Sequence, residues 1–259
     1  MTVSEKTRRR YLRIQEMLGK QGRVSVLVLS EALGVSAMTV RRDIEALEQS
    51  GVVLRTHGGC ILRSPFVTEA AFPEKESRQR QEKQSIASQA VRGIASGMSL
   101  YLDTGTTCLY IARLLPPDQD LTVFTNNIRI ATELLGRSGI DVIVYGGQLS
   151  PRNPDLTGDL AIAQLVRFRV DLAFLGGDAL DPRSGTFYAA DRATAVMTQA
   201  IRGQADQAVA VIDSSKIGKR GPVVAGCLDK GLTLITDAGC PAAVRKSLRG
   251  TGARLVIAR

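Results

Sequence analysis

Five short polar segments, each following an apolar run, carry the residues of this sequence best suited to bind a small polar molecule. They are Asp103–Thr107 (DTGTT), Thr125–Asn127 (TNN), Gly146–Gly147, Gly176–Asp178 (GGD) and Asp213–Lys216 (DSSK). Threonine hydroxyls and backbone amides suit a phosphate, a lysine ammonium adds a point charge, and aspartate or asparagine suits sugar hydroxyls. The candidate phosphate ligands are Thr106, Thr107 and Lys216, and the candidate hydroxyl ligands are Asp103, Asn126 and Asp178.

The apolar runs that precede these segments predict the strands that would position them. They are Ser99–Leu102, Leu121–Phe124, Val142–Tyr145, Leu172–Leu175 and Ala208–Ile212, and Leu232–Ile235 follows. Because helical patterns alternate with these runs, we expect an α/β domain with a mainly parallel sheet covered by helices. Open α/β sheets bind ligands at the carboxyl ends of strands, where helix starts present free amides to anions. Any one polar segment fits an ordinary turn equally well, but their recurrence predicts a polar crevice that includes Gly146 and Gly147.

The first 62 residues predict a small helical module. Residues 5–18 have apolar side chains at helical spacing, which predicts a first amphipathic helix. Ser25 is expected to cap a short second helix that Gly34 stops. Ser36 is expected to cap a third helix over Ala37–Gln49. Helix, short glycine-containing turn and helix is the spacing of the helix-turn-helix DNA reader.

One face of the third predicted helix carries residues suited to DNA. Its buried stripe is formed by residues at i, i+4 and i+7, namely Val40, Ile44 and Leu47. At about 100° per residue, Met38 and Arg42 then point away from the core, and Thr39 and Arg41 flank them. Basic residues near a helix amino terminus suit phosphates and base edges in a major groove. The alternative, a solvated face of an ordinary three-helix unit, is disfavoured because these basic residues cluster at one end.

The segment after the third predicted helix has the pattern of a wing. Val52–Leu62 predicts two short strands around a glycine turn. On such a hairpin, Arg55 and His57 are positioned to touch the DNA backbone or the minor groove. For His57, a hydrogen-bonded turn residue is an equally good interpretation.

The charge distribution favours a nucleic-acid partner for the N-terminal segment. The chain has a net charge of +9, and residues 1–64 hold 11 Lys and Arg against 6 Asp and Glu. Residues 65–259 hold 23 against 19. A compact basic segment is the electrostatic footprint of a nucleic-acid partner, although proteins that bind phosphorylated metabolites are also often basic.

Several enzyme classes lack their residues in this chain. The four cysteines form no CxxC pair and His57 is the only histidine, which weakens the case for a zinc site or a histidine-activated nucleophile. There is no GxGxxG after the first predicted strand and no GxxxxGK[ST], so we expect no cofactor and no metal. The polar amino terminus, and the lack of an apolar stretch of roughly 18 residues, predict a cytoplasmic protein without a membrane span.

The segment Val24–Cys60, which contains LGVSAMTVRRDIEALEQSG and RTHGGC, resembles the winged helix-turn-helix of the DeoR family of bacterial sugar-metabolism repressors. The resemblance is specific because it joins TVRRD to the HGG wing at the family's separation. It implies a repressor that binds its operator through this module and carries a sugar-phosphate sensor behind it. Carried across by motif, the implied DNA-reading residues are Ser36, Thr39, Arg41 and Arg42, with wing support from Arg55 and His57.

The resemblance extends over about residues 5–258. The motifs LDTGTT, TNN, GG, DLAFLGG, DSSKIG and LITDAG stand in the order of the DeoR effector domain, which is similar to ribose-5-phosphate isomerases. In that family the GTT loop, the TNN loop and the SK lysine surround the phosphorylated sugar. The implied effector residues are Gly105, Thr106, Thr107, Thr125, Asn126, Asn127 and Lys216. Glu82 and Lys83 form a pair that is frequent in the family.

The sequence departs from the family pattern in one place. Many members have a lysine shortly before a methionine, whereas Tyr188–Met197 reads YAADRATAVM. Any effector contact from this segment would therefore need Asp191 or Arg192.

These expectations divide the chain into a winged helix-turn-helix DNA-binding domain (1–62), a linker (63–75) and an α/β effector-sensor domain (76–259) that begins with a long helix over residues 76–95. The predicted function is a transcription regulator, a repressor of a carbohydrate-metabolism operon that a phosphorylated sugar releases from its operator. Reading two half-sites of double-stranded DNA predicts a homodimer or tetramer. The alternative is an isomerase-like enzyme with an appended DNA-binding module, in which Asp103, Asp178 and Lys216 would supply acid and base. The basic module favours the regulator, and the chain is not expected to be an enzyme.

Overall fold

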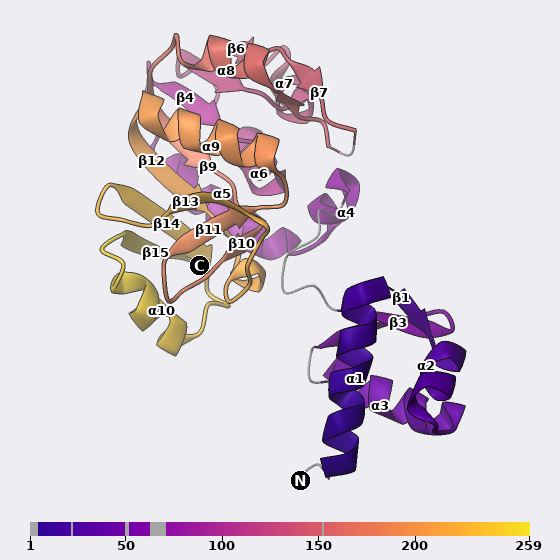
Figure 1. Cartoon of the computed structure of the whole chain (residues 1–259). Helices are drawn as coiled ribbons and strands as arrows, with labels where there is room; N and C mark the ends of the chain where they lie inside the picture. Colours follow the sequence, from indigo (N-terminus) through magenta and orange to yellow (C-terminus); the bar gives the residue numbers. More distant parts are fainter. Residues whose placement is uncertain (1–4, 22, 50–51, 63–70, 152) are drawn as a thin grey trace. The chain divides into compact units, whose positions relative to one another are not determined.

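The chain forms two compact units, Met1–Pro65 and Phe66–Arg259, and each has a core of its own (Figure 1). The computed structural model describes residues 5–21, 23–49, 52–62, 71–151 and 153–259. The first eight residues of the predicted linker, 63–70, lie outside these ranges. Within the described ranges, no helix has the length and apolar character that a membrane crossing requires.

The N-terminal unit is a winged helix. Its helices are α1 (Glu5–Gln21), α2 (Val26–Leu33) and α3 (Ala37–Gln49), and its strands are β1 (Arg23–Ser25), β2 (Val53–Thr56) and β3 (Gly59–Leu62). The strands pair antiparallel in the order β1-β3-β2. The predicted bounds of α3 are confirmed, and α1 continues from the amphipathic residues 5–18 to Gln21.

Two caps and one close backbone contact shape this unit. Ser25 Oγ accepts a hydrogen bond from Val28 N at 3.3 Å, and Gly34 ends α2 in the left-handed region with a φ of 63°, as predicted. The sequence does not predict β1, because three residues give no clear periodicity. A Cβ on Gly59 would lie 2.2 Å from the carbonyl oxygen of Val24, so a glycine at this position lets β3 approach β1.

The C-terminal unit is built on a seven-stranded sheet with the order β15-β14-β12-β9-β4-β5-β6. Its strands are β4 (Ser99–Leu102), β5 (Leu121–Thr125), β6 (Ile140–Val144), β9 (Val170–Leu175), β12 (Ala205–Val211), β14 (Leu232–Asp237) and β15 (Arg254–Ala258). All neighbouring strands pair parallel. The six predicted strands are confirmed, and β15 is an addition at one edge.

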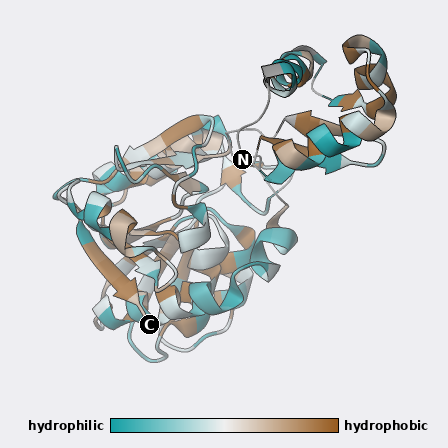
Figure 2. Ribbon diagram, turned by 90° about the horizontal axis from the view of Figure 1, so that it is seen from below, coloured by the Kyte–Doolittle hydropathy of each residue, from teal (hydrophilic) through white to brown (hydrophobic). Residues whose placement is uncertain are grey.

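Helices cover both faces of this sheet. Helices α5 (Arg80–Ala90), α6 (Thr106–Leu114) and α7 (Ile128–Leu134) share one core cluster, and α8 (Asp159–Leu165), α9 (Arg192–Gln204) and α10 (Ala242–Arg249) share the other. Along β9, Leu172 and Phe174 belong to the first cluster, whereas Ala173 and Leu175 belong to the second. This alternation places successive side chains on opposite faces of the sheet. Figure 1 shows α9 in front of the sheet, and in Figure 2 hydrophobic colour recurs along the strands.

Short elements surround the carboxyl ends of the strands. Strands β10 (Ala179–Leu180), β11 (Thr186–Ala189) and β13 (Val223–Cys227) form a small antiparallel sheet, β7 (Gln148–Leu149) pairs with β8 (Leu156–Thr157), and η2 (Ser214–Lys216) is a single 3-10 turn. Another such turn, η1 (Val91–Gly93), follows α5 and precedes β4. Strands of two residues carry no readable alternation, so the sequence does not predict them.

A break replaces the single long helix predicted over residues 76–95. The chain forms α4 (Phe72–Ser77) and then α5, because Arg78 is extended and Gln79 adopts a left-handed φ of 50°. Pro73 lies in the first turn of α4, where a missing N–H breaks no helical hydrogen bond. Phe72 is buried in the core cluster of α5 and α6. Residues 72–75 of the predicted linker therefore form the beginning of a packed helix.

Candidate functional site

The exposed face of α3 presents the residues that the sequence selects for DNA. Met38 is 59% exposed, Arg41 and Arg42 are exposed, and Thr39 is half-buried. The predicted buried stripe of Val40, Ile44 and Leu47 is confirmed. This amphipathic pattern holds α3 against the core while its first two turns display cationic side chains.

Ser36 fixes the beginning of α3. Its Oγ accepts a hydrogen bond from Thr39 N at 3.3 Å, as an N-cap does, and lies 3.0 Å from Thr39 Oγ1. Both hydroxyls are exposed or half-buried, so they remain within reach of a ligand at the helix start.

The wing stands beside α3. Arg55 N donates a hydrogen bond to Glu48 Oε1 at 3.1 Å, and the carbonyl oxygen of His57 accepts one from Arg23 Nη2 at 3.1 Å. The side chains of Arg41, Arg55 and His57 line a common hollow between α3 and the wing. The structure therefore brings together three DNA-binding candidates from two elements.

An ion pair connects α1 to α3. Arg10 Nε lies 2.7 Å from Asp43 Oδ2, and Arg10 Nη2 lies 2.9 Å from Asp43 Oδ1. The side chain of Asp43 is 6% exposed, and the hydrogen bond to it raises the pKa of Arg10. This bidentate contact fixes the rotation of α3, and with it the direction of its exposed face.

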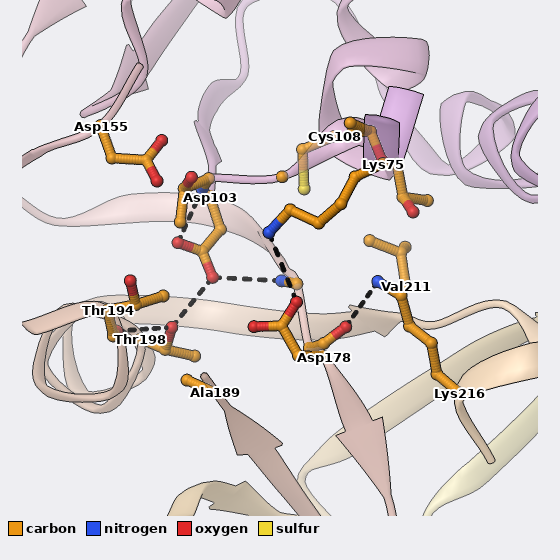
Figure 3. A pocket seen from close by; sticks show the side chains of 16 residues that line it. Lys75, Asp103, Cys108, Asp155, Asp178, Ala189, Thr194, Thr198, Val211 and Lys216 are labelled. Atoms are coloured by element: carbon orange, nitrogen blue, oxygen red, sulfur yellow. Dashed lines mark hydrogen bonds and ion pairs between the residues drawn. The ribbon is translucent and has the colours of Figure 1, made fainter. Parts of the chain in front are cut away.

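A crevice in the C-terminal unit opens at the carboxyl ends of β4, β9 and β12 (Figure 3). The predicted residues that line it are Asp103, Gly105, Thr106, Thr107, Asp178 and Lys216. The crevice is also lined by residues that the sequence does not predict as effector ligands, namely Lys75, Asp155, Thr194 and Thr198. The crevice is therefore assembled from the ends of β4, β9, β11 and β12 and from α4, α6 and α9.

The start of α6 forms one wall of the crevice. Gly105 precedes it with a φ of 118°, a conformation that favours glycine. The first bond of the helix runs from Leu109 N to Gly105 O, so the N–H groups of Thr106, Thr107 and Cys108 have no partner within the helix. Thr107 Oγ1 is buried and finds no hydrogen-bond partner among the described residues. Free donors at a helix amino terminus attract anions.

Two ammonium groups extend toward this helix start. Lys216 Nζ donates to Gly177 O at 2.7 Å, and Lys75 Nζ lies 3.5 Å from Asp178 Oδ1 (Figure 3). Burial tends to raise the pKa of Asp178, but the charges of Lys75 and Lys216 outweigh it and hold this pKa below its ordinary value. Asp178 therefore carries a negative charge that keeps both ammonium groups at the crevice.

Asp103 lies at the floor of the crevice and is 1% exposed. Its Oδ1 accepts Thr104 N at 2.8 Å, and its Oδ2 accepts Gly176 N at 3.1 Å and the Thr198 hydroxyl at 3.0 Å. Burial raises the pKa of Asp103 to about 7, although these three hydrogen bonds act in the opposite direction. The carboxyl group can therefore exchange a proton near neutral pH.

The TNN loop stands behind the crevice wall. Thr125, Asn126 and Asn127 are completely buried. Asn126 Oδ1 accepts the Tyr101 hydroxyl at 2.8 Å, and Asn127 Nδ2 donates to Asp155 Oδ1 at 2.6 Å. In this conformation the loop positions Asp155, whose pKa is raised chiefly by burial, rather than lining the crevice itself.

Gly146 and Gly147 support the crevice from a distance. Gly146 N donates to Gln164 Oε1 at 3.1 Å, and a Cβ on Gly147 would lie 2.5 Å from Thr157 O. Gly146 contacts α8, Gly147 packs against β8 and α8, and neither glycine lines the crevice.

Helix α9 lines the crevice with threonines, and not with Asp191 or Arg192, the two residues that the sequence suggests for an effector contact. Asp191 is the N-cap: its Oδ1 accepts Thr194 N at 2.9 Å and its Oδ2 accepts the Thr194 hydroxyl at 2.7 Å. Thr194 and Thr198, one helical turn apart, line the crevice, whereas Asp191 and Arg192 do not. A threonine pair at i and i+4 after an N-cap aspartate is visible in the sequence, and this pattern could have predicted the two lining residues.

Lys83, from the Glu82–Lys83 pair, secures the break between α4 and α5. It is 2% exposed, and its ammonium donates to the carbonyl oxygens of Lys75 and Arg78. Burial, followed by the charge of Lys216, lowers the pKa of Lys83 to about 8. This contact holds the end of α4, and therefore Lys75, beside the crevice.

Two family models match the chain. Residues 10–66 match the DeoR-like helix-turn-helix domain, and residues 78–238 match the DeoR C terminal sensor domain. Among curated proteins, the HTH-type transcriptional regulator GlpR of Haloferax volcanii is 34% identical over 94% of this chain and 95% of its own length. The glycerol-3-phosphate regulon repressor of Escherichia coli K12 is 30% identical over 94% of this chain and 96% of its own.

The chain is also similar to a third curated repressor and to one solved enzyme structure. The putative aga operon transcriptional repressor of Escherichia coli O157:H7 is 31% identical over 97% of this chain and 94% of its own length. Ribose 5-phosphate isomerase A from Methanocaldococcus jannaschii is 16% identical over 53% of this chain and 54% of that chain, with a TM-score of 0.39.

Proposed function

Because this chain belongs to the DeoR family of transcriptional regulators, we propose that it is a repressor that a phosphorylated sugar releases from operator DNA. The names of two relatives, a glycerol-3-phosphate regulon repressor and a putative aga operon repressor, are consistent with control of a carbohydrate-metabolism operon. The observation that carries the proposal is the buried Thr107 hydroxyl at the α6 start, which is unpartnered among the described residues. The same chain displays the exposed Arg41 and Arg42 on α3.

The N-terminal unit supplies the DNA contacts in this proposal. Arg41 and Arg42 reach phosphates and base edges from the first turns of α3, with Met38 and Thr39 beside them. Arg55 and His57 add contacts from the wing, and the hollow that they share with Arg41 supports their common use.

The C-terminal unit supplies the effector contacts. The phosphate binds the free amides of α6, the Thr107 hydroxyl and the ammonium groups of Lys75 and Lys216. Asp103 and Asp178 accept hydrogen bonds from sugar hydroxyls. The positive end of the α6 dipole and the two lysines stabilise the bound charge.

A homodimer is part of the proposal. One winged helix covers a small interface and discriminates poorly between sequences, whereas a two-fold pair reads two half-sites. We also propose a cytoplasmic location, which the proposed DNA partner supports.

A screen of the full-length chain against phosphorylated sugars tests the effector assignment. A ligand at 100 times its Kd stabilises the folded state by about 2.7 kcal/mol, which a thermal-shift assay detects. We expect at least one phosphorylated sugar to raise the melting temperature, while the same sugar without phosphate does not. Equal shifts from both forms, or no shift from any phosphorylated sugar, would contradict the assignment.

Selection of duplexes from a random DNA pool tests the DNA assignment. We expect a two-fold symmetric site whose affinity falls steeply as salt is raised, because Lys and Arg displace counterions from phosphates. Recovery of no enriched sequence would contradict it.

A further inference from the structure

A second hollow adjoins the crevice on the side of α4. It shares Lys75, Thr106, Asp178 and Lys216 with the crevice. It adds the side chains of Arg78, Gln79, Lys83, Asp213, Ser215 and Lys219. Because Thr106 and two lysines line both spaces, one ligand can extend from the α6 start into the second hollow.

Positive charge dominates this second hollow. Five cationic residues line it against two carboxylates, those of Asp178 and Asp213. Asp178 already faces Lys75 and Lys216. Asp213 Oδ1 accepts hydrogen bonds from the amide and the hydroxyl of Ser215, and its Oδ2 lies 3.9 Å from Lys216 Nζ. The carboxylates are therefore occupied with the two lysines that the hollow shares with the crevice.

Among the described residues, the remaining cations form no ion pair with a carboxylate of the hollow. Lys83 is 2% exposed and is bound by two carbonyl oxygens, which carry no net charge. Lys219 is exposed and forms no ion pair with any residue that the structure describes. Arg78 pairs with Glu74, which is outside the hollow and 51% exposed. Burial, followed by the charge of Lys216, disfavours the charged form of Lys83, and the charge of Asp213 opposes this without restoring the ordinary pKa. An anion between these side chains would relieve the repulsion between neighbouring like charges.

We propose that this hollow is a second anion subsite, and that the effector carries two anionic groups. The first group binds at the α6 start, and the second binds among Arg78, Lys83 and Lys219. The corresponding ligand class is a sugar bisphosphate or a phosphorylated sugar acid. This inference rests on the proposed sugar-phosphate function and specifies the ligand of the same site.

Crystals of the full-length chain soaked in tungstate test the two subsites separately. Tungstate is a tetrahedral oxyanion with a strong anomalous signal, so each bound ion is located directly. We expect one ion at the α6 start and one in the second hollow. The double variant R78Q/K219Q changes two exposed side chains and should lose only the second ion, whereas T107V should weaken only the first. R129Q, which changes an exposed arginine on α7, is the matched control and should keep both.

The outcomes separate this inference from the proposed function. An ion at the α6 start without a second ion overturns the inference and leaves the proposed function intact. A second ion that persists in R78Q/K219Q is an adventitious ion only and also overturns the inference. Absence of the first ion counts against the phosphate site of the proposed function.

Affinity measurements on sugars that stabilise the wild-type chain give a second test. A compound with two anionic groups should bind about tenfold tighter than its singly charged counterpart, and R78Q/K219Q should remove this difference. Equal affinity of the two compounds for the wild-type chain overturns the inference.

Discussion

Lys75 Nζ lies 3.5 Å from Asp178 Oδ1, although 103 positions separate the two residues in the sequence. Their side chains are 20% and 16% exposed, so the pair is largely shielded from water. Lys75 comes from α4, whose Phe72 is buried against the core of α5 and α6, and Asp178 follows β9. The contact therefore brings the first helix of the C-terminal unit to the proposed effector crevice.

Replacement of Lys75 tests the role of this pair. Lys75→Met should weaken binding of a phosphorylated sugar by about tenfold, because one charge-assisted hydrogen bond is lost. The pKa of Asp178 should rise, because the charge of Lys75 would no longer join that of Lys216 in opposing the effect of burial. Titration calorimetry of the variant, beside Lys230→Met at an exposed site outside the crevice, measures the first effect. Identical affinities in the two variants would remove Lys75 from the site.

Thr107→Val separates binding from folding. The Thr107 hydroxyl is buried without a partner among the described residues, and an unsatisfied polar group of this kind costs about 1–3 kcal/mol. The valine variant should therefore be at least as stable to denaturant as the wild type. It should still bind DNA but fail to respond to the phosphorylated sugar. Thr132→Val, on the exposed surface of α7, is the matched control that keeps the response. A normal sugar response in Thr107→Val would contradict the phosphate assignment.

Asp103 should make stability depend on pH. Its ordinary pKa is 3.8, and burial raises the folded-state pKa to about 7. Between about pH 4 and 7 the unfolded chain has lost this proton while the folded chain retains it. The free energy of unfolding should therefore fall as pH rises through this interval, by up to roughly 1.4 kcal/mol per pH unit from this group.

Denaturant curves of wild type and Asp103→Asn across that interval measure this slope. Asparagine does not titrate, so the difference in free energy of unfolding between the two proteins should change with pH. Parallel curves from pH 4 to 7 would show that Asp103 has no raised pKa.

The Arg10–Asp43 pair should stabilise the N-terminal unit. Asp43→Ala removes the bidentate partner of Arg10. The side chain of Asp43 is 6% exposed and that of Arg10 is 23% exposed, so Arg10 would lose its partner in a largely buried position. Hydrogen bonds to charged groups contribute about 1.5–3 kcal/mol, so we expect a loss of about 2 kcal/mol. Hydrogen exchange of the amides in α1 and α3 reports this loss for the N-terminal unit alone. Glu16→Ala, which breaks the exposed pair with Arg13, is the control and should change protection little. Equal protection in both variants would contradict a structural role for the Arg10–Asp43 pair.

Arg42→Ala should weaken binding to the selected duplex by roughly 1–3 kcal/mol and relax sequence preference, if Arg42 reads a base. Arg13→Ala, an exposed arginine on α1, is the matched control. Fluorescence anisotropy on matched and mutated duplexes measures both effects. A uniform loss on every duplex would assign Arg42 to a phosphate instead.

Local patterns predicted much of this fold because local forces decide those elements. The bounds of α3 follow from the Ser36 cap and from the Val40, Ile44 and Leu47 stripe, which lie within one stretch of chain. The six central strands are apolar runs, and burial on both faces produces such runs. By contrast, β15 lies at the edge of the sheet, where only one of its five residues is fully buried.

The crevice was less predictable because distant segments complete it. The sequence selects residues at strand ends, and Asp103, Thr107 and Lys216 do line the crevice. Thr198 approaches Asp103 across 95 positions, and no periodicity encodes such a contact. The TNN loop has suitable residue types, but burial of Asn126 and Asn127 directs their amides to protein partners.

Reciprocal coupling between operator and effector tests the central claim most directly. The measurement is the affinity of the full-length chain for its selected duplex with and without a saturating phosphorylated sugar, and the affinity for that sugar with and without the duplex. We predict that the sugar weakens DNA binding about tenfold, or about 1.4 kcal/mol, and that the duplex weakens sugar binding by the same factor. A chain that binds both ligands, with neither affinity changed by the other ligand, would contradict the claim.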